Sequence, residues 1–546
     1  PTPHVQEALK TDSLRALRKF LEGEAAYAGS GDMVVAAEAY KEAFQIDTTF
    51  WIAAAMYGNT QSSWIEHHAP DLEAPDSAIV LPLLVHVDDL LEPQRSWVRA
   101  APWRFGLPAN AWYEDVTRKE LLDRFADLAA SQWDFWPIVA DYGDAALHEG
   151  ALWGHSKSDA RRAFTRALEL NPAVSWVVNH EGLSMESGQA GRYQEMFERA
   201  EAGSLDLRDA LPSDPWHTLW SFSRSYAVEN VDDRVISYAR EVLRSRVVAG
   251  DPTNSGLACT GRFVPFLLGR PRCLVDYFGP LLEAEPDPNN RAWYGLAIAS
   301  GWAAVGAWDS AMVHVSQAVP VPGSAAALPA YRIGVLGRWL GYVDAEAIAA
   351  LRDHAFNAAD TVGSSLQPAR HILLAEFAWL DGMVAVAGDD LAGLRDSRAR
   401  IQGEDDWVVN RFERSLAAFE LALDGDTTAA ADSLYALEMF VPADEAPILW
   451  THTGYEEIPI NQAVNRLAAS RWLLALGDTV RAEELLAWQE VLHPPAVKVN
   501  GIVVGLANLQ LARIEHARGD REEARGHYLR FLKTDPVDDY ADMGAE

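Results

Sequence analysis

One phrase recurs along this 546-residue chain and constrains its fold more than any other feature. A small residue is followed four positions later by a large apolar or aromatic one, and in several copies by another small one. The copies are Ala36-Tyr40-Ala43, Ala160-Phe164-Ala167, Ala311-Val315-Ala318, Ala430-Leu434, Ala482-Leu486 and Ala524-Tyr528-Phe531. Residues three and four apart share one face of a helix. A repeated face of this kind is buried by stacking against neighbouring copies, so the pattern predicts an all-α fold, an α-solenoid (superhelix) of helical hairpins.

Four of these copies follow a Gly-Asp pair, as in Gly425-Asp426, Gly477-Asp478 and Gly519-Asp520. Glycine tolerates the left-handed backbone that ends a helix, and aspartate caps the helix that follows. Each pair is therefore predicted to be the turn inside a hairpin. A calcium loop starting at Asp424 is excluded, because its sixth and twelfth positions are Ala429 and Tyr435 instead of glycine and glutamate.

The domain organisation that we expect is one continuous array over residues 1–546, with a bend allowed in the middle. It consists of N-terminal repeats (1–205), irregular middle repeats (206–370) and C-terminal repeats (371–546). A split near residue 250 is the alternative. The stretch from Trp51 to Tyr113 is rich in proline, so its helices should be short or kinked.

The net charge of −33 argues against nucleic acid and anionic lipid as partners, because both carry negative charge. Most of the carboxylates are expected to be solvated; a basic peptide or protein partner is the alternative. No stretch reaches the ~20 strongly apolar residues of a membrane helix, so this segment is not expected to insert into a membrane. The chain begins at Pro1 rather than Met, which indicates processing or a longer parent protein.

The two cysteines, Cys259 and Cys273, are separated by a loop-like segment, which leaves a disulfide between them open. So few cysteines fit a reducing or an oxidising compartment. An extracytoplasmic location, periplasmic or at the cell surface, is favoured slightly over the cytoplasm.

The sequence contains no motif that would support catalysis or metal binding. His148-Glu149 and His180-Glu181 lack the second histidine of a zinc protease, because Leu152 and Ser184 stand at that position. Phosphate-binding loops, a nucleophile elbow and a dinucleotide fingerprint are also missing. We therefore expect no enzyme activity, no metal and no cofactor.

Three passages carry a family resemblance: residues 21–27 (LEGEAAY), residues 142–154 (YGDAALHEGALWG) and residues 519–524 (GDREEA). With them, the chain resembles the tetratricopeptide-repeat helical region found C-terminal to bacterial serine/threonine protein kinases and in related bacterial signalling proteins. The chain itself has no kinase motifs. The resemblance implies a TPR-like superhelix.

In TPR-like units the first helix of each pair lines the concave surface. Counting back from the glycine turns nominates eight inward-facing positions: Tyr142, Glu149, Trp153, Trp293, Ser300, Arg471, Arg513 and His516. The expected function is a protein-interaction scaffold that binds a peptide or protein, or its own copies, in a bacterial signalling or envelope assembly. The 20 tryptophans suggest an alternative, an extracytoplasmic module that binds glycans or envelope fragments on tryptophan platforms.

Overall fold

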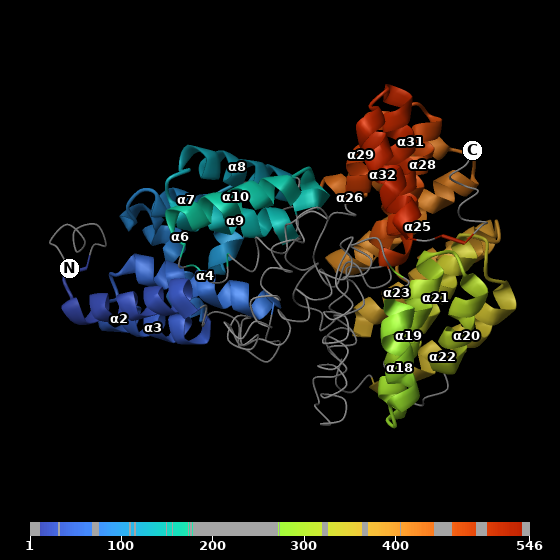
Figure 1. The fold of residues 1–546 in the computed structure, drawn as a ribbon, viewed down its shortest axis with the longest axis horizontal. Coiled ribbons are helices and arrows are strands. Elements are labelled where there is room, and N and C mark those ends of the chain that lie inside the picture. The colour runs from blue at the N-terminus through green and yellow to red at the C-terminus, as the bar shows by residue number, and fades with distance from the viewer. Residues whose placement is uncertain are drawn as a thin grey trace, which may run out of the picture. The chain divides into compact units, whose positions relative to one another are not determined.

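A computed structural model describes residues 11–30, 33–67, 76–108, 111–113, 116–148, 150–155, 157–172, 174, 177, 271, 273–318, 326–362, 370–403, 406–441, 461–487, 500–534 and 536–537. Every regular element in these ranges is helical (Figure 1). The prediction of an all-α fold is confirmed.

The chain divides into two compact units. Unit 1 is Pro1–Ser184 with Met439–Tyr455, and unit 2 is Met185–Glu438 with Glu456–Glu546. The single array over 1–546, with its sections 1–205, 206–370 and 371–546, stays a prediction.

Unit 1 begins with a helical hairpin, α2 and α3, and contains a second hairpin, α9 and α10, whose helices pack closely on each other. Its elements are α2 (Leu14–Ala25), η1 (Ala26–Ser30), α3 (Met33–Ile46), α4 (Trp51–His67), α5 (Ser77–Val80), α6 (Leu83–His86), η2 (Val87–Asp89), α7 (Gln94–Ala100), η3 (Pro102–Phe105), α8 (Arg118–Ser131), α9 (Trp136–His148), η4 (Gly150–Trp153) and α10 (Lys157–Leu170). The proline-rich part holds the short helices α5, α6 and α7, as predicted, although α4 before them runs for 17 residues.

Unit 2 is a longer succession of hairpins. Its elements are α18 (Cys273–Ala284), α19 (Pro288–Ala304), α20 (Trp308–Ala318), α21 (Ala327–Trp339), α22 (Ala345–Val362), α23 (Arg370–Val386), α24 (Leu391–Ala399), α25 (Trp407–Leu423), α26 (Thr427–Met439), α28 (Asn461–Ala475), α29 (Thr479–Leu486), η7 (Asn500–Val503), α31 (Val504–Arg518) and α32 (Arg521–Lys533). The first helices of successive hairpins contact one another in chain order, α19 with α21, α21 with α23, α23 with α25 and α25 with α28. This ordered stacking is consistent with a solenoid-like arrangement.

The recurring phrase supplies the contacts within hairpins. Its small and large residues lie on the second helices α3, α10, α20, α26, α29 and α32, and all but Tyr528 are buried. On the facing helix a glycine makes room for the large residue. A Cβ atom at Gly143 of α9 would lie 2.9 Å from the ring of Phe164, so only glycine lets the two helices approach this closely.

The glycine turns have the backbone that was predicted. Gly425, Gly477 and Gly519 have φ angles of 94°, 84° and 91°, in the left-handed region. Asp426 and Asp478 then cap the next helix, and their carboxylates accept hydrogen bonds from the backbone N–H three residues on. The cap predicted at Asp520 is wrong, because its side chain makes no capping hydrogen bond to α32.

This difference between equivalent aspartates predicts a difference in stability. Replacing Asp478 by alanine should lower the free energy of unfolding by about 1–2 kcal/mol, since the cap of α29 is lost. The same change at Asp520 removes no cap and should cost less than half as much. Urea unfolding of both variants, followed by circular dichroism, measures the two values; equal losses would show that the cap contributes nothing.

Candidate functional site

The first helices of the hairpins in unit 2 are buried over most of their length. Continuous buried stretches cover residues 294–301 of α19, 327–337 of α21, 461–470 of α28 and 504–512 of α31. A helix that is buried on every side has no polar face to give to solvent. The first helices in unit 2, on which the sequence nominated Trp293, Ser300, Arg471, Arg513 and His516, therefore lie largely in the interior of that unit.

The segment after α32 returns to α19. Helix α19 contacts η7, and the Val537 N–H donates a 2.9 Å hydrogen bond to the Val305 carbonyl just after α19. Hairpins more than 200 residues apart in the sequence thus touch.

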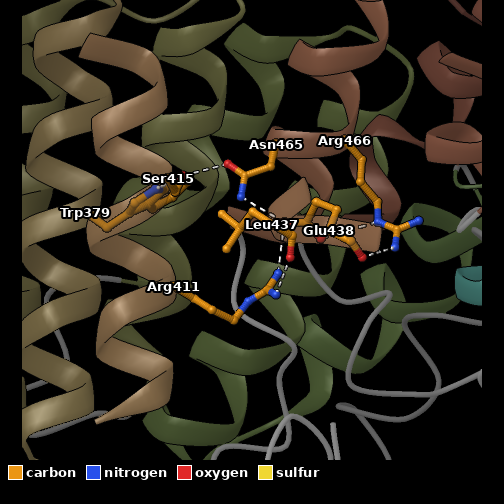
Figure 2. Close-up of polar contacts among 7 residues, drawn as sticks. All are labelled: Trp379, Arg411, Ser415, Leu437, Glu438, Asn465 and Arg466. Carbon is orange, nitrogen blue, oxygen red and sulfur yellow. Dashed lines mark hydrogen bonds and ion pairs between the residues drawn. The ribbon is translucent and has the colours of Figure 1, made fainter. Parts of the chain in front are cut away.

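The buried stretch of α28 carries polar residues, and these join an ionic network at Glu438 (Figure 2). Glu438 lies in the last turn of α26 and has no exposed surface. Its Oε1 accepts 2.9 Å hydrogen bonds from Arg411 Nη2 of α25 and Asn465 Nδ2 of α28. Its Oε2 lies 3.4 Å from Nε of Arg466, which is also fully buried. One carboxylate therefore serves two arginines from two different hairpins.

The same arginines satisfy the last carbonyls of α26. Arg411 Nη1 donates to the Leu437 carbonyl at 2.8 Å, and Arg466 Nη2 reaches the Glu438 carbonyl at 3.3 Å. Carbonyls in the last turn of a helix have no partner within the helix. The two guanidinium groups thus donate hydrogen bonds to the carbonyls at the end of α26. Both arginines lie on other helices, so these bonds depend on tertiary packing.

A second arm of the network continues toward α23. The Ser415 hydroxyl donates to Asn465 Oδ1 at 2.6 Å and accepts from the Trp379 indole N–H at 2.9 Å, as Figure 2 shows. Burial lowers the pKa of Arg466, while the adjacent Glu438 carboxylate opposes that shift. The network lies in the interior, so its chemistry is suited to holding α23, α25, α26 and α28 in register.

Unit 1 has a comparable buried centre. The Asp141 carboxylate of α9 accepts hydrogen bonds from the Trp97 indole at 3.0 Å and from Arg104 Nη2 at 2.6 Å. Arg104 also pairs with Asp144 at 2.8 Å. Burial raises the pKa of Asp141, although the Arg104 charge counteracts it. The pattern again indicates a structural role, because these side chains lie inside the packing of α4, α7 and α9.

Tyr142, one of the nominated residues, is buried and lies in a relay of hydrogen bonds. Its hydroxyl is 3.0 Å from His155 Nδ1, and His155 Nε2 is 2.9 Å from the Asp123 carboxylate of α8. Burial raises the pKa of the Tyr142 phenol, so the phenol stays protonated. The relay connects α8, α9 and the segment between η4 and α10.

The other nominated residues have contrasting positions. Trp153 is fully buried and presents no ring to a glycan, and Ser300 is buried with its hydroxyl donating to the Leu296 carbonyl at 2.8 Å. Trp293 is half-buried. Glu149 lies outside the described residues.

Three nominated basic residues are exposed, namely Arg471 on α28 and Arg513 and His516 on α31. Each lies on the carboxyl-terminal side of the long buried stretch of its helix. The Arg471 guanidinium lies over the Trp339 ring of α21, 5.6 Å from its centre, which is a cation–π distance. These residues are the part of the predicted surface that a partner can reach.

Residues of the Glu438 network were missed by sequence reasoning. The sequence did contain one sign of buried polar residues, because Asn465 and Arg466 interrupt an apolar run between Val464 and Leu467. The carboxylate that compensates them lies 27 and 28 positions away along the chain, and no local pattern points to it.

Among the described residues, no group of three or more His, Cys, Asp or Glu side chains is placed to hold a metal ion, and no helix has the length and apolar character needed to cross a membrane. Cys259 lies outside the described residues, as does the side chain of Cys273, so their disulfide stays a prediction.

Comparison with known proteins does not assign this chain to a family. No protein-family model matches the chain, and no curated protein matches it. The resemblance to tetratricopeptide regions is therefore carried by the quoted sequence passages.

Proposed function

We propose that this chain is a non-catalytic interaction scaffold of TPR-like hairpins that binds a peptide or protein partner. The observation that carries the proposal is the exposure of Arg471, Arg513 and His516 on helices that are otherwise buried. The resemblance to regions attached to bacterial signalling kinases supports the same function and would place the scaffold in a signalling or envelope assembly.

The chemistry at Arg471 favours a partner that bears carboxylates. Arg471 is exposed, and the positive charge of an exposed guanidinium group attracts carboxylates. The ring of Trp339 restricts the arginine side chain, so less conformational entropy is lost on binding. His516 lies in the last turn of α31, where a positive charge is stabilised by the helix dipole.

Charge reversal at Arg471 tests this proposal. Wild-type protein and the Arg471→Glu variant are immobilised and incubated with extract of the source cells, and the retained proteins are quantified by mass spectrometry. We expect Arg471→Glu to retain at least about tenfold less of the specific partner than wild type does. This corresponds to about 1.4 kcal/mol of binding free energy. Arg525→Glu, an exposed arginine on the outer helix α32, is the control and should retain the partner.

Two outcomes would contradict the proposal. One is equal capture by all three proteins, which would move binding away from α28. The other is no specific capture by wild type, together with no self-association in sedimentation velocity up to high micromolar concentrations.

A further inference from the structure

The last described hairpin, α31 and α32, contains an acid–base pair that the scaffold function does not use. Glu515 Oε1 of α31 lies 3.4 Å from Nε2 of His527 on α32. Their side chains are only 11% and 13% exposed. The second oxygen of Glu515, Oε2, is buried and has no hydrogen-bond partner.

A neighbouring amide defines which nitrogen of His527 carries a proton. Asn508 Nδ2 donates to the Val504 carbonyl at 3.1 Å, which leaves Asn508 Oδ1 as the atom that faces His527 Nδ1 at 2.9 Å. Oδ1 can only accept, so Nδ1 must donate. Arg530 Nη1 lies farther from the same nitrogen, at 3.4 Å, and does not change this assignment. A neutral His527 therefore turns the lone pair of Nε2 toward the carboxyl group of Glu515.

A lone pair and an ionised carboxylate repel each other unless a proton lies between them. We propose that Glu515 and His527 hold one shared proton, and that losing it weakens the packing of α32 on α31, which makes this hairpin a pH-sensitive element. The inference is independent of whether a partner binds.

The surrounding charges decide where the proton resides. Burial and, after it, the negative charges of Glu483 on α29 and of Glu523 and Asp520 at the start of α32 together raise the pKa of Glu515 to about 7, against the Arg530 charge. Burial and, after it, the Arg530 charge lower the pKa of His527 to about 4. Between these values a neutral carboxylic acid faces a neutral imidazole, and the acid donates the shared proton.

The pH dependence follows from proton counting. In an opened hairpin the two groups have ordinary pKa values of about 4.3 and 6.5. At pH 5.5 the closed and opened hairpins each hold one proton, on the glutamate and on the histidine respectively. Around pH 6.5 to 7 the closed form holds on average about 0.3 more protons than the opened form, so raising the pH favours opening. Integrated from pH 5.5 to 8.5, this gives about a threefold rise in the opening equilibrium.

Hydrogen exchange measured by mass spectrometry on the full chain tests this inference. Exchange of peptides from α31 and α32, corrected for the intrinsic pH dependence, should correspond to about threefold more opening at pH 8.5 than at pH 5.5. In the Glu515→Gln variant the amide donates to Nε2 at every pH. Opening should then fall with rising pH, because only His527 still titrates. Glu522→Gln, a fully solvated glutamate on α32, should behave like wild type.

A wild-type measurement keeps the inference falsifiable if Glu515→Gln does not fold. In a histidine NMR titration, one imidazole should stay neutral with a proton on Nδ1 down to about pH 5, and His527→Gln should remove that signal. The inference is overturned if no histidine stays neutral there, or if Glu515→Gln opens with rising pH as wild type does.

Discussion

Replacing Glu438 by glutamine should lower the free energy of unfolding by about 3–5 kcal/mol. Glutamine preserves the shape of the side chain but removes the charge that Arg411 and Arg466 share in the interior of unit 2. A buried cation that loses its counter-ion is strongly destabilising, because little water can reach it. Urea unfolding followed by circular dichroism measures the loss.

A surface pair on the same helix provides the control. Asp432 of α26 binds Arg481 at 2.7 Å, but its side chain is half exposed. Asp432→Asn should cost less than about 1 kcal/mol, because solvent screens exposed pairs. Similar losses from Glu438→Gln and Asp432→Asn would show that the network is not the organising centre of these hairpins.

Phe164→Ala should destabilise unit 1 by about 3–5 kcal/mol. The ring is fully buried between α9 and α10 and sits against the backbone of Gly143. Truncation leaves a cavity that the hairpin cannot close, since Gly143 has no side chain to move into it. Thermal or urea unfolding of the variant gives the loss.

The matched change at a solvent-exposed site is Phe356→Ala on α22, where the side chain is 47% exposed. The change removes the same atoms but leaves no closed cavity. We therefore expect the free energy of unfolding to fall by less than half as much as in Phe164→Ala. Equal effects would contradict the assignment of the recurring large residue to the core.

Local features of the fold were predictable because their causes are local. The glycine turns at 425, 477 and 519 follow from the conformational freedom of glycine, and the buried faces of α3 and α10 follow from helical spacing. The cap at Asp520 was not predictable in the same way. Whether a side chain turns toward the helix depends on competing contacts, and Asp478 makes the bond where Asp520 does not.

The candidate surface itself stays a prediction. Of the residues nominated by counting from the turns, Arg471, Arg513 and His516 lie on first helices of hairpins and are exposed. The same count also nominated Ser300 and Trp153, which are buried. Counting along one helix cannot reveal how many neighbours cover it, and inner helices of a stacked array are covered from several sides.

The amino-acid sequence alone determined that this protein is built of helical hairpins, since short-range spacing and turn chemistry act within about 40 residues, the size of one repeat. Tertiary structure decided which inner residues are buried, how Glu438 compensates two distant arginines, and that the segment at Val537 packs beside Val305. Those features depend on contacts between segments far apart in the chain. Their positions are set by the accumulated packing of many hairpins, which no local pattern records.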